Sequence, residues 1–101
     1  MKIDFEINGN TMHISFHGDI LYAETIDLSG FFDKRLAESF DEAVLDFSDV
    51  TGITSSAIGA VIDFHGKLKK KSRSMRISGM SDKAYTVFKY FKLDELFPIE
   101  K

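Results

Sequence analysis

The 101-residue sequence contains no cysteine and no tryptophan, and its single proline is Pro98, near the end. Without cysteine the chain can form no disulfide, no zinc–thiolate site and no thiol nucleophile. No stretch approaches the roughly 18 apolar residues that a membrane-spanning helix needs. Residues 1–5 alternate polar and apolar side chains, unlike the apolar core of a signal peptide. We therefore expect a cytoplasmic protein that inserts no segment into a membrane.

Other absences narrow the range of functions. The net charge of −3 argues against nucleic acid as a general partner. Neither G-x-x-x-x-G-K-[ST] nor G-x-G-x-x-G occurs, so no nucleotide-binding loop is evident. The three histidines, His13, His17 and His65, offer no usable helical pair and no nearby carboxylate cluster, so we expect neither a metal site nor a cofactor. They are also badly placed to activate a serine nucleophile, which disfavours an enzyme.

The remaining composition suits one folded domain that spans residues 1–101. Hydrophobic residues make up 44% of the chain, and ten of its residues are phenylalanine, so a sizeable core is available. We find no internal repeat, low-complexity segment or linker. We expect this domain to be a monomer or a weak dimer.

Five short segments have the apolar patterns of β-strands. The first two are joined by the turn signal Asn8-Gly9-Asn10 and predict a hairpin. In the second strand His13, Ser15 and His17 fall on the face opposite the apolar residues. The third segment is continuously apolar, as in a central strand buried on both faces. The predicted strands are Ile3–Ile7, Met12–Phe16, Ala43–Phe47, Met75–Ser78 and, at the sheet edge, Phe97–Ile99.

Three segments have the spacing of amphipathic helices. The first is predicted from about Tyr22 to Glu38, with Ile26 exposed. The second begins near Ser55 and ends around Gly66 and the lysines that follow it. The third is capped by Ser81. The predicted core-facing residues are Leu21, Leu28, Phe32 and Leu36 in the first helix, Ile58, Val61, Ile62, His65 and Leu68 in the second, and Ala84, Val87, Phe88 and Phe91 in the third.

A hairpin followed by alternating strands and helices predicts an α/β fold. The sheet should be mixed, with four to five strands, and about three to four helices should pack against it. The segment Lys67–Arg76 carries six positive residues in ten positions. A solvated helix end accounts for this segment best. A surface that binds nucleic acid or a membrane is the alternative, but the segment lacks the interleaved aromatic residues of such a surface.

The most informative stretch runs from Asp46 to Gly59 and joins the central strand to the second helix through a loop rich in hydroxyls. It places the Ser55 hydroxyl at a helix N-terminus near the surface, where free N–H groups and the helix dipole favour a phosphate. The same pattern fits a plain N-cap, in which Thr54, Ser55 or Ser56 accepts a bond from a first-turn N–H. The two interpretations are compatible.

Four neighbours of these hydroxyls have their own expected roles. Asp46 and Asp49 lack the ligand spacing of a calcium loop, so we expect them to end the strand and shape the turn. Ala57 and Gly59 have small or no side chains, so a partner can approach the first helical turn closely. Gly59 would equally permit close packing of the helix on the sheet.

These residues resemble the signature of the STAS domain, a family named for sulfate transporters and anti-sigma-factor antagonists. The resemblance implies a sheet packed against helices, with a phosphorylatable serine at the start of the second helix. That position is Ser55 here, with Ser56 as the neighbouring fallback. In size the chain is similar to the free-standing anti-sigma-factor antagonists. The similar segments are Val44-Leu45-Asp46-Phe47-Ser48, Ile53-Thr54-Ser55-Ser56-Ala57-Ile58-Gly59 and the tail Phe91–Ile99.

The resemblance further implies partner switching. An anti-sigma factor that is also a serine kinase would bind the unmodified protein, release its sigma factor and phosphorylate Ser55 with ATP. A PP2C-type phosphatase would remove the phosphate, so the protein would be a substrate and not a catalyst. The implied partner-binding residues are Asp19, Thr54, Ser55, Ser56, Ala57, Ile58 and Gly59.

Two positions depart from the family pattern. Thr54 stands where many members have Asp, and Leu21 stands where an acidic residue often follows the second strand, with Asp19 two positions earlier. Together with the exposed Ile26, these departures favour an alternative: a constitutive STAS subunit of an ABC-type lipid transport complex, bound to its ATPase. A third hypothesis is a nucleotide sensor, since some STAS domains are credited with nucleotide binding.

Overall fold

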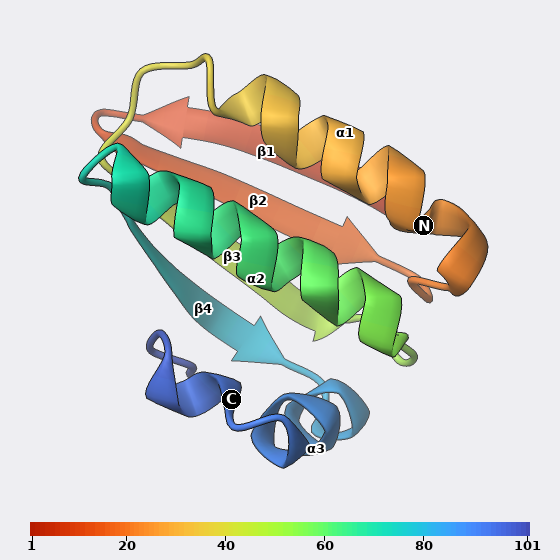
Figure 1. The fold of residues 1–101 in the computed structure, drawn as a ribbon. Coiled ribbons are helices and arrows are strands. Elements are labelled where there is room, and N and C mark those ends of the chain that lie inside the picture. Colours follow the sequence, from red (N-terminus) through yellow and green to blue (C-terminus); the bar gives the residue numbers. More distant parts are fainter.

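The computed structural model describes residues 1–101 as a four-stranded sheet with helices packed over one face (Figure 1). β1 and β2 form the predicted antiparallel hairpin, and β3 and β4 continue the sheet parallel to β2. This mixed sheet confirms the predicted α/β fold. In order across the sheet, the strands are β1 (Lys2–Asn8), β2 (Thr11–His17), β3 (Glu42–Asp49) and β4 (Ser74–Met80).

The expected fifth strand is reduced to a single parallel bridge at the edge of β4. Ile77 pairs there with Ile99, and two backbone hydrogen bonds of 2.9 Å join Ile77 to Pro98 and Glu100. Proline is tolerated at the edge of a sheet because no neighbouring strand needs a hydrogen bond from its missing N–H.

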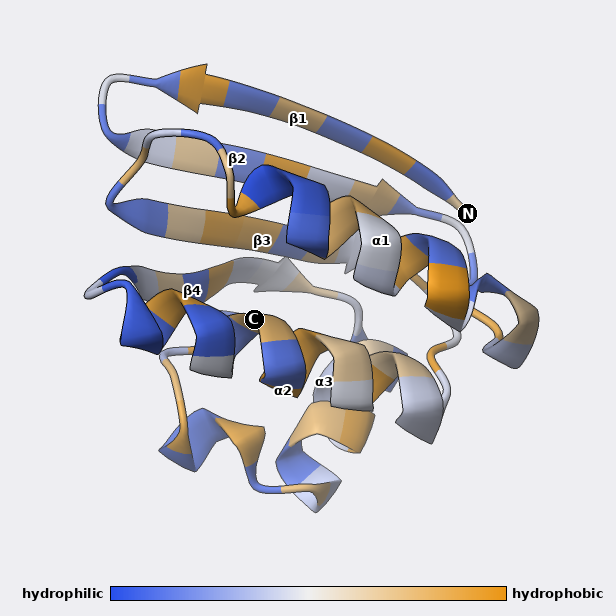
Figure 2. Cartoon of the chain, turned by 45° about the horizontal axis from the view of Figure 1, so that its top comes forward, coloured by the Kyte–Doolittle hydropathy of each residue, from blue (hydrophilic) through white to orange (hydrophobic).

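Two of the three α-helices, α1 and α2, lie side by side over one face of the sheet. α1 and α2 cover it, whereas α3 and the C-terminal segment lie beyond β4 (Figure 1). Figure 2 shows apolar and polar bands alternating along β1, as expected for a strand with one face turned towards a helix; Phe5 on that face contacts Phe31 of α1. No helix combines the length and the apolar composition that crossing a bilayer demands. The helical segments are the 3-10 turn η1 (Tyr22–Glu24), α1 (Thr25–Arg35), α2 (Ser55–Lys70), α3 (Asp82–Tyr90) and the 3-10 turn η2 (Leu93–Glu95).

The core lies between this face and the helices and contains no buried polar residue. A row of phenylalanine rings runs through it. Phe16 stacks on Phe47 with ring centroids 4.6 Å apart, and Phe32 stacks on Phe64 at 4.3 Å. Phe16 also meets Phe32 edge-on, while Phe88 lies 5.4 Å from Phe47. The row connects all three helices to β2 and β3.

Four predicted core residues lie outside the core: Leu21, Ile62, His65 and Phe91. Leu21 precedes a 3-10 turn that breaks the helical phase, and Phe91 follows the end of α3. In α2 the buried stripe includes Phe64, which stacks on Phe32 and turns Ile62 and His65 towards the rim.

The first predicted helix is too long, because α1 stops at Arg35 and not at about Glu38. α2 ends at Lys70, within the run of lysines predicted to mark its end. The actual end of α2 is a Schellman motif, with Ser72 in the left-handed region at φ 59°. The N–H of Ser72 donates to Lys69 O (3.0 Å), and the N–H of Arg73 donates to Leu68 O (2.9 Å).

Candidate functional site

The chain leaves β2 and β3 in two loops that pair with each other. The N–H of Ile20 donates to Gly52 O (2.8 Å), and the N–H of Thr54 donates to Ile20 O (3.2 Å). The Asp19 carboxylate accepts a hydrogen bond from the Thr51 hydroxyl. Asp19 therefore helps to hold the loop that leads into α2, and it is exposed at the surface.

Carboxylates shape this loop from its other side. Asp46 Oδ1 accepts hydrogen bonds from the Ser48 N–H (2.9 Å) and hydroxyl (2.6 Å). Both residues lie inside β3, which continues to Asp49, so the expectation that Asp46 ends the strand is wrong. Asp49 Oδ2 lies 2.9 Å from Nδ1 of His17, whose Nε2 lies 3.3 Å from Asp4 Oδ2. The expectation that no histidine has carboxylates nearby is thus wrong for His17, because strand pairing brings Asp4 and Asp49 to its ring. No group of three or more His, Asp or Glu side chains is placed to hold a metal ion.

α2 begins at Ser55, which confirms the predicted start, and Thr54 is its N-cap. Thr54 has an extended backbone, and its Oγ1 accepts a hydrogen bond from the N–H of Ala57 at 3.4 Å. Of the three hydroxyls that the sequence pattern allowed as caps, the structure selects Thr54. The first turn of α2 contains no acidic residue, so no charge compensates the helix dipole there.

Ser55 and Ser56 differ in what their hydroxyls contact. Ser56 Oγ is partly buried, 3.2 Å from Thr54 Oγ1 and 3.3 Å from Thr25 Oγ1 of α1. Ser55 is exposed, and its hydroxyl forms no hydrogen bond within the protein. A modifying enzyme could reach the Ser55 oxygen without breaking a contact, whereas the Ser56 oxygen would first have to leave two hydroxyls.

The predicted partner-binding residues do not all reach the surface. Ala57 and Ile58 are buried, so their side chains belong to the core. Gly59 is exposed, and a Cβ built on it would meet no atom within 4 Å. The expectation that Gly59 permits packing on the sheet is therefore wrong. Gly59 lies one turn after Ser55 on the same side of the helix, so no side chain projects beside the Ser55 hydroxyl from that position.

Exposed apolar side chains lie at the neighbouring end of α1. Ile26 is 84% exposed, as predicted, and Tyr22 is 77% exposed. The Thr25–Ser56 contact places this end of α1 against the start of α2. Sequence reasoning missed Tyr22 because it lies inside the range predicted as one regular helix, where only Ile26 broke the apolar stripe.

The carboxylate of Glu24, close to Leu21 in the sequence, is paired with groups of the protein itself. It lies 2.8 Å from the α-ammonium of Met1 and accepts a hydrogen bond from the Leu21 N–H (3.1 Å). The ammonium first, and then the backbone N–H, hold the pKa of Glu24 below its usual value. The Glu24 carboxylate therefore closes the η1 turn and does not replace the acidic residue that the family often has at position 21.

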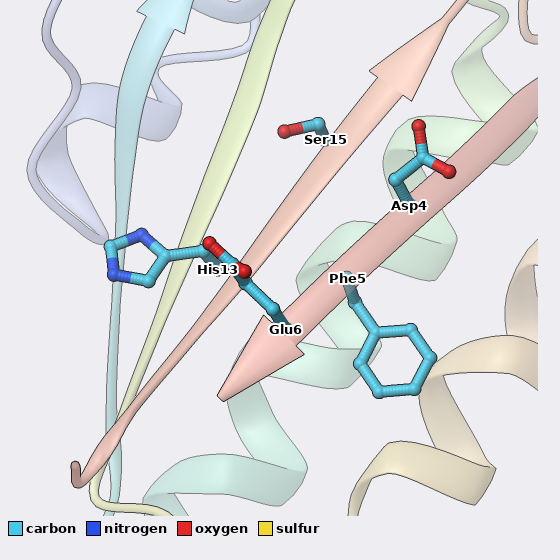
Figure 3. Close-up of a pocket in the computed structure, with 5 residues that line it drawn as sticks. All are labelled: Asp4, Phe5, Glu6, His13 and Ser15. Atoms are coloured by element: carbon cyan, nitrogen blue, oxygen red, sulfur yellow. The ribbon is translucent and has the colours of Figure 1, made fainter. Parts of the chain in front are cut away.

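A shallow hollow of about 190 Å³ lies on the sheet face that no helix covers (Figure 3). It is lined by Asp4, Phe5, Glu6, His13 and Ser15. His13 forms no hydrogen bond with Ser15 or with either carboxylate. Nucleophilic catalysis uses a contact between nucleophile and base, and this hollow does not contain one.

Comparison with known proteins gives a family and a fold. The family model of the STAS domain matches residues 2–101. The chain is similar to the structure of an anti-sigma factor antagonist from Mycobacterium paratuberculosis, with a TM-score of 0.87 and 19% identity over 97% of this chain and 83% of that one. It is also similar to the phosphorylated form of the Bacillus cell fate determinant SpoIIAA, with a TM-score of 0.75 and 14% identity over 99% and 92% of the two chains.

A sulfate transporter family protein from Wolinella succinogenes is similar as well, with a TM-score of 0.77 and 18% identity over 93% and 80% of the two chains. At these identities the similarity establishes a shared fold, which an anti-sigma factor antagonist and a sulfate transporter family protein have in common. No curated protein matches the sequence.

Proposed function

Because the chain belongs to the STAS domain family, we propose that it is an anti-sigma-factor antagonist whose partner depends on phosphate at Ser55. The observation that carries this proposal is the free Ser55 hydroxyl, exposed at the first residue of α2. Asp19, Thr54, Ser55, Ser56 and Gly59 would face the partner, with Ser56 as the fallback for modification.

The helix start suits a phosphate electrostatically. Phosphorylation adds up to about −2 charge and three acceptor oxygens. The N–H groups of Ser55 and Ser56 have no acceptor inside the helix, and the dipole favours negative charge there. The first cation along α2 is Lys67, about 18 Å further on at 1.5 Å per residue. The phosphate would therefore be stabilised by the helix N-terminus, with no ion pair from α2 to neutralise it.

The same phosphate would act against binding. An interface formed around a neutral hydroxyl would have to bury an unpaired charge. A penalty of roughly 3–4 kcal/mol weakens binding by about two to three powers of ten, which is enough to exchange partners. The unmodified protein would hold the anti-sigma factor and free the sigma factor, and the phosphorylated protein would be released.

In this mechanism the chain is a cytoplasmic substrate and supplies no catalytic group. Ser55 Oγ attacks the γ-phosphorus of ATP in the kinase partner, the bond to ADP breaks, and the hydroxyl proton leaves to a base of the kinase. A PP2C-type phosphatase then hydrolyses the phosphoserine with water. Gly59 lets the kinase approach the hydroxyl closely.

The test is to incubate the protein with candidate serine kinases and ATP, and to map phosphate by mass spectrometry. We expect phosphate on Ser55, none in Ser55→Ala, and undiminished incorporation in the matched variant Ser56→Ala. Phosphate confined to another residue, or incorporation unchanged in Ser55→Ala, would overturn the proposal.

One observation favours a second function. Tyr22 and Ile26 are exposed near Thr25, which contacts Ser56, and would suit a permanent apolar contact, as in a subunit bound to the ATPase of an ABC-type lipid transport complex. Co-purification of an ATPase at fixed stoichiometry, with no phosphate on the chain, would select this function. Dissociation of that complex on Ser55 phosphorylation would exclude it.

A further inference from the structure

The far end of α2 contains a hollow that the proposed function does not use. It opens between the last turns of α2, the start of β4 and the C-terminal segment, and has a volume of about 330 Å³. The residues of α2 that line it, His65 and Lys69, lie about 15–21 Å from Ser55 along the helix at 1.5 Å per residue. Its lining residues are His65, Lys69, Arg73, Ser74, Met75, Leu96, Phe97 and Pro98.

One side of the hollow is cationic. Lys67 and Arg76, at the two ends of the basic segment, are paired with carboxylates. The four cations between them form no ion pair: Lys69, Lys70, Lys71 and Arg73. A solvated helix end describes Lys70 and Lys71, which are exposed and do not line the hollow. Lys69 and Arg73 line it, and no acidic side chain joins them.

Arg73 is held in place before any ligand arrives. The Schellman motif fixes its backbone, and Nη1 donates to Leu36 O at 3.2 Å. Its guanidinium carbon lies 4.4 Å from the centroid of the Phe40 ring. The remaining N–H donors of the guanidinium stay free, so little side-chain entropy would be lost on binding an anion.

The opposite side of the hollow is apolar. Met75 and Phe97 are buried at its base, and Leu96 is half-exposed at its rim. The His65 ring lies edge-on to Phe97, with centroids 5.1 Å apart. Burial, and then the charge of Lys69, lower the pKa of His65, so at neutral pH its ring is a neutral hydrogen-bonding group and the charge comes from Lys69 and Arg73.

We propose that this hollow binds a small organic monocarboxylate with an apolar tail, its carboxylate on Lys69 and Arg73 and its tail against Leu96 and Phe97. Lys69 and Arg73 have no carboxylate partner in the protein and lie beside an apolar wall. Such a site favours a ligand that carries both a negative charge and an apolar group. The volume lies near the lower end of small-molecule sites, about 300–1,000 Å³, which suits a ligand of this size.

The test is titration of the full chain with octanoate, followed by amide chemical shifts. Octanol and acetate are run in parallel, because the first keeps the tail without the charge and the second keeps the charge without the tail. We expect octanoate to shift amides of the lining residues with a dissociation constant on the order of 1 mM. Octanol and acetate should each bind at least about ten times more weakly.

The matched variants are Lys69→Glu and Lys70→Glu, which make the same charge change at adjacent exposed positions. We expect Lys69→Glu to weaken octanoate binding about tenfold or more, and Lys70→Glu to change it less than about threefold. Equal binding of octanoate and octanol, equal effects of the two variants, or shifts centred elsewhere would overturn the proposal. Ser55 takes no part in this test, so its result is independent of the proposed function.

Discussion

The starts of α2 and α3 use the same capping chemistry and differ in what remains free. Thr54 caps α2, and Ser81 caps α3 by accepting the N–H of Ala84 at 3.1 Å. The Ser81 hydroxyl also donates to Val50 O, so both of its hydrogen-bonding functions are occupied. At α2 the cap is a threonine, and the hydroxyl of the next residue, Ser55, has no partner.

The next positions differ in the same sense. The first residue of α3 is Asp82, which supplies the negative charge that a helix start favours and pairs with Lys101 at 2.8 Å. The first residue of α2 is Ser55, and no acid compensates the dipole. A serine near a helix start is therefore structural where its hydroxyl is bonded, and available for modification where the cap is another residue.

Ser81→Ala should have the largest effect on stability. It removes the cap of α3 and leaves the carbonyl of the buried Val50 without its hydroxyl donor, for a loss of about 2 kcal/mol in the free energy of unfolding. Urea denaturation measures this loss. Ser55→Ala is the matched control and should change stability by less than about 0.5 kcal/mol. Equal losses for both variants would remove the distinction between the two serines.

Thr54→Ala should cost about 1 kcal/mol, because it removes the N-cap bond to Ala57. The same substitution at Thr86, on the exposed side of α3, keeps the cap intact and should cost less than about 0.5 kcal/mol. Thermal unfolding of both variants is sufficient to rank them. A Thr54→Ala protein as stable as the parent would mean that Ser55 or Ser56 can cap the helix instead.

Gly59→Ala should raise stability by about 0.5–1 kcal/mol, because alanine loses less backbone entropy in a helix and its Cβ meets no atom. Gly66→Ala, in the same helix and equally unobstructed, should stabilise to a similar extent. Only Gly59→Ala should weaken binding to the proposed kinase partner, as measured by calorimetry. Unchanged binding in both variants would show that Gly59 lies outside the interface.

The smallest expected effect is the pH dependence at the start of α3. The hydrogen bond and charge of Lys101 lower the pKa of Asp82, so this pair stabilises the fold above the unfolded pKa of about 3.9 and is lost as the pH falls through the lower folded value. Asp82→Asn should therefore be less stable than the parent at pH 7, with the difference shrinking towards pH 3. A difference that persists at low pH would point to a cause other than this carboxylate.

Much of the fold could be predicted because hydrophobic periodicity decides it locally. The hairpin, the buried β3 and the start of α2 at Ser55 all follow from residue order. The cap could not be assigned, since three successive hydroxyl residues fit the pattern and only backbone geometry selects Thr54.

Contacts between distant segments escaped prediction for a related reason. The pair His17–Asp49 depends on strand pairing, and the packing of Phe64 on Phe32 depends on how α1 meets α2. The family resemblance named Ser55, but the structure adds why Ser55 and not Ser56 is free: the Ser56 hydroxyl is held between Thr54 and Thr25.

The most direct measurement compares the affinity of the proposed anti-sigma kinase partner for the unmodified protein with its affinity for protein fully phosphorylated on Ser55. If the spare hydroxyl at the start of α2 controls partner choice, calorimetry should show the phosphorylated form binding about two to three powers of ten more weakly. Equal affinities for the two forms would contradict the account.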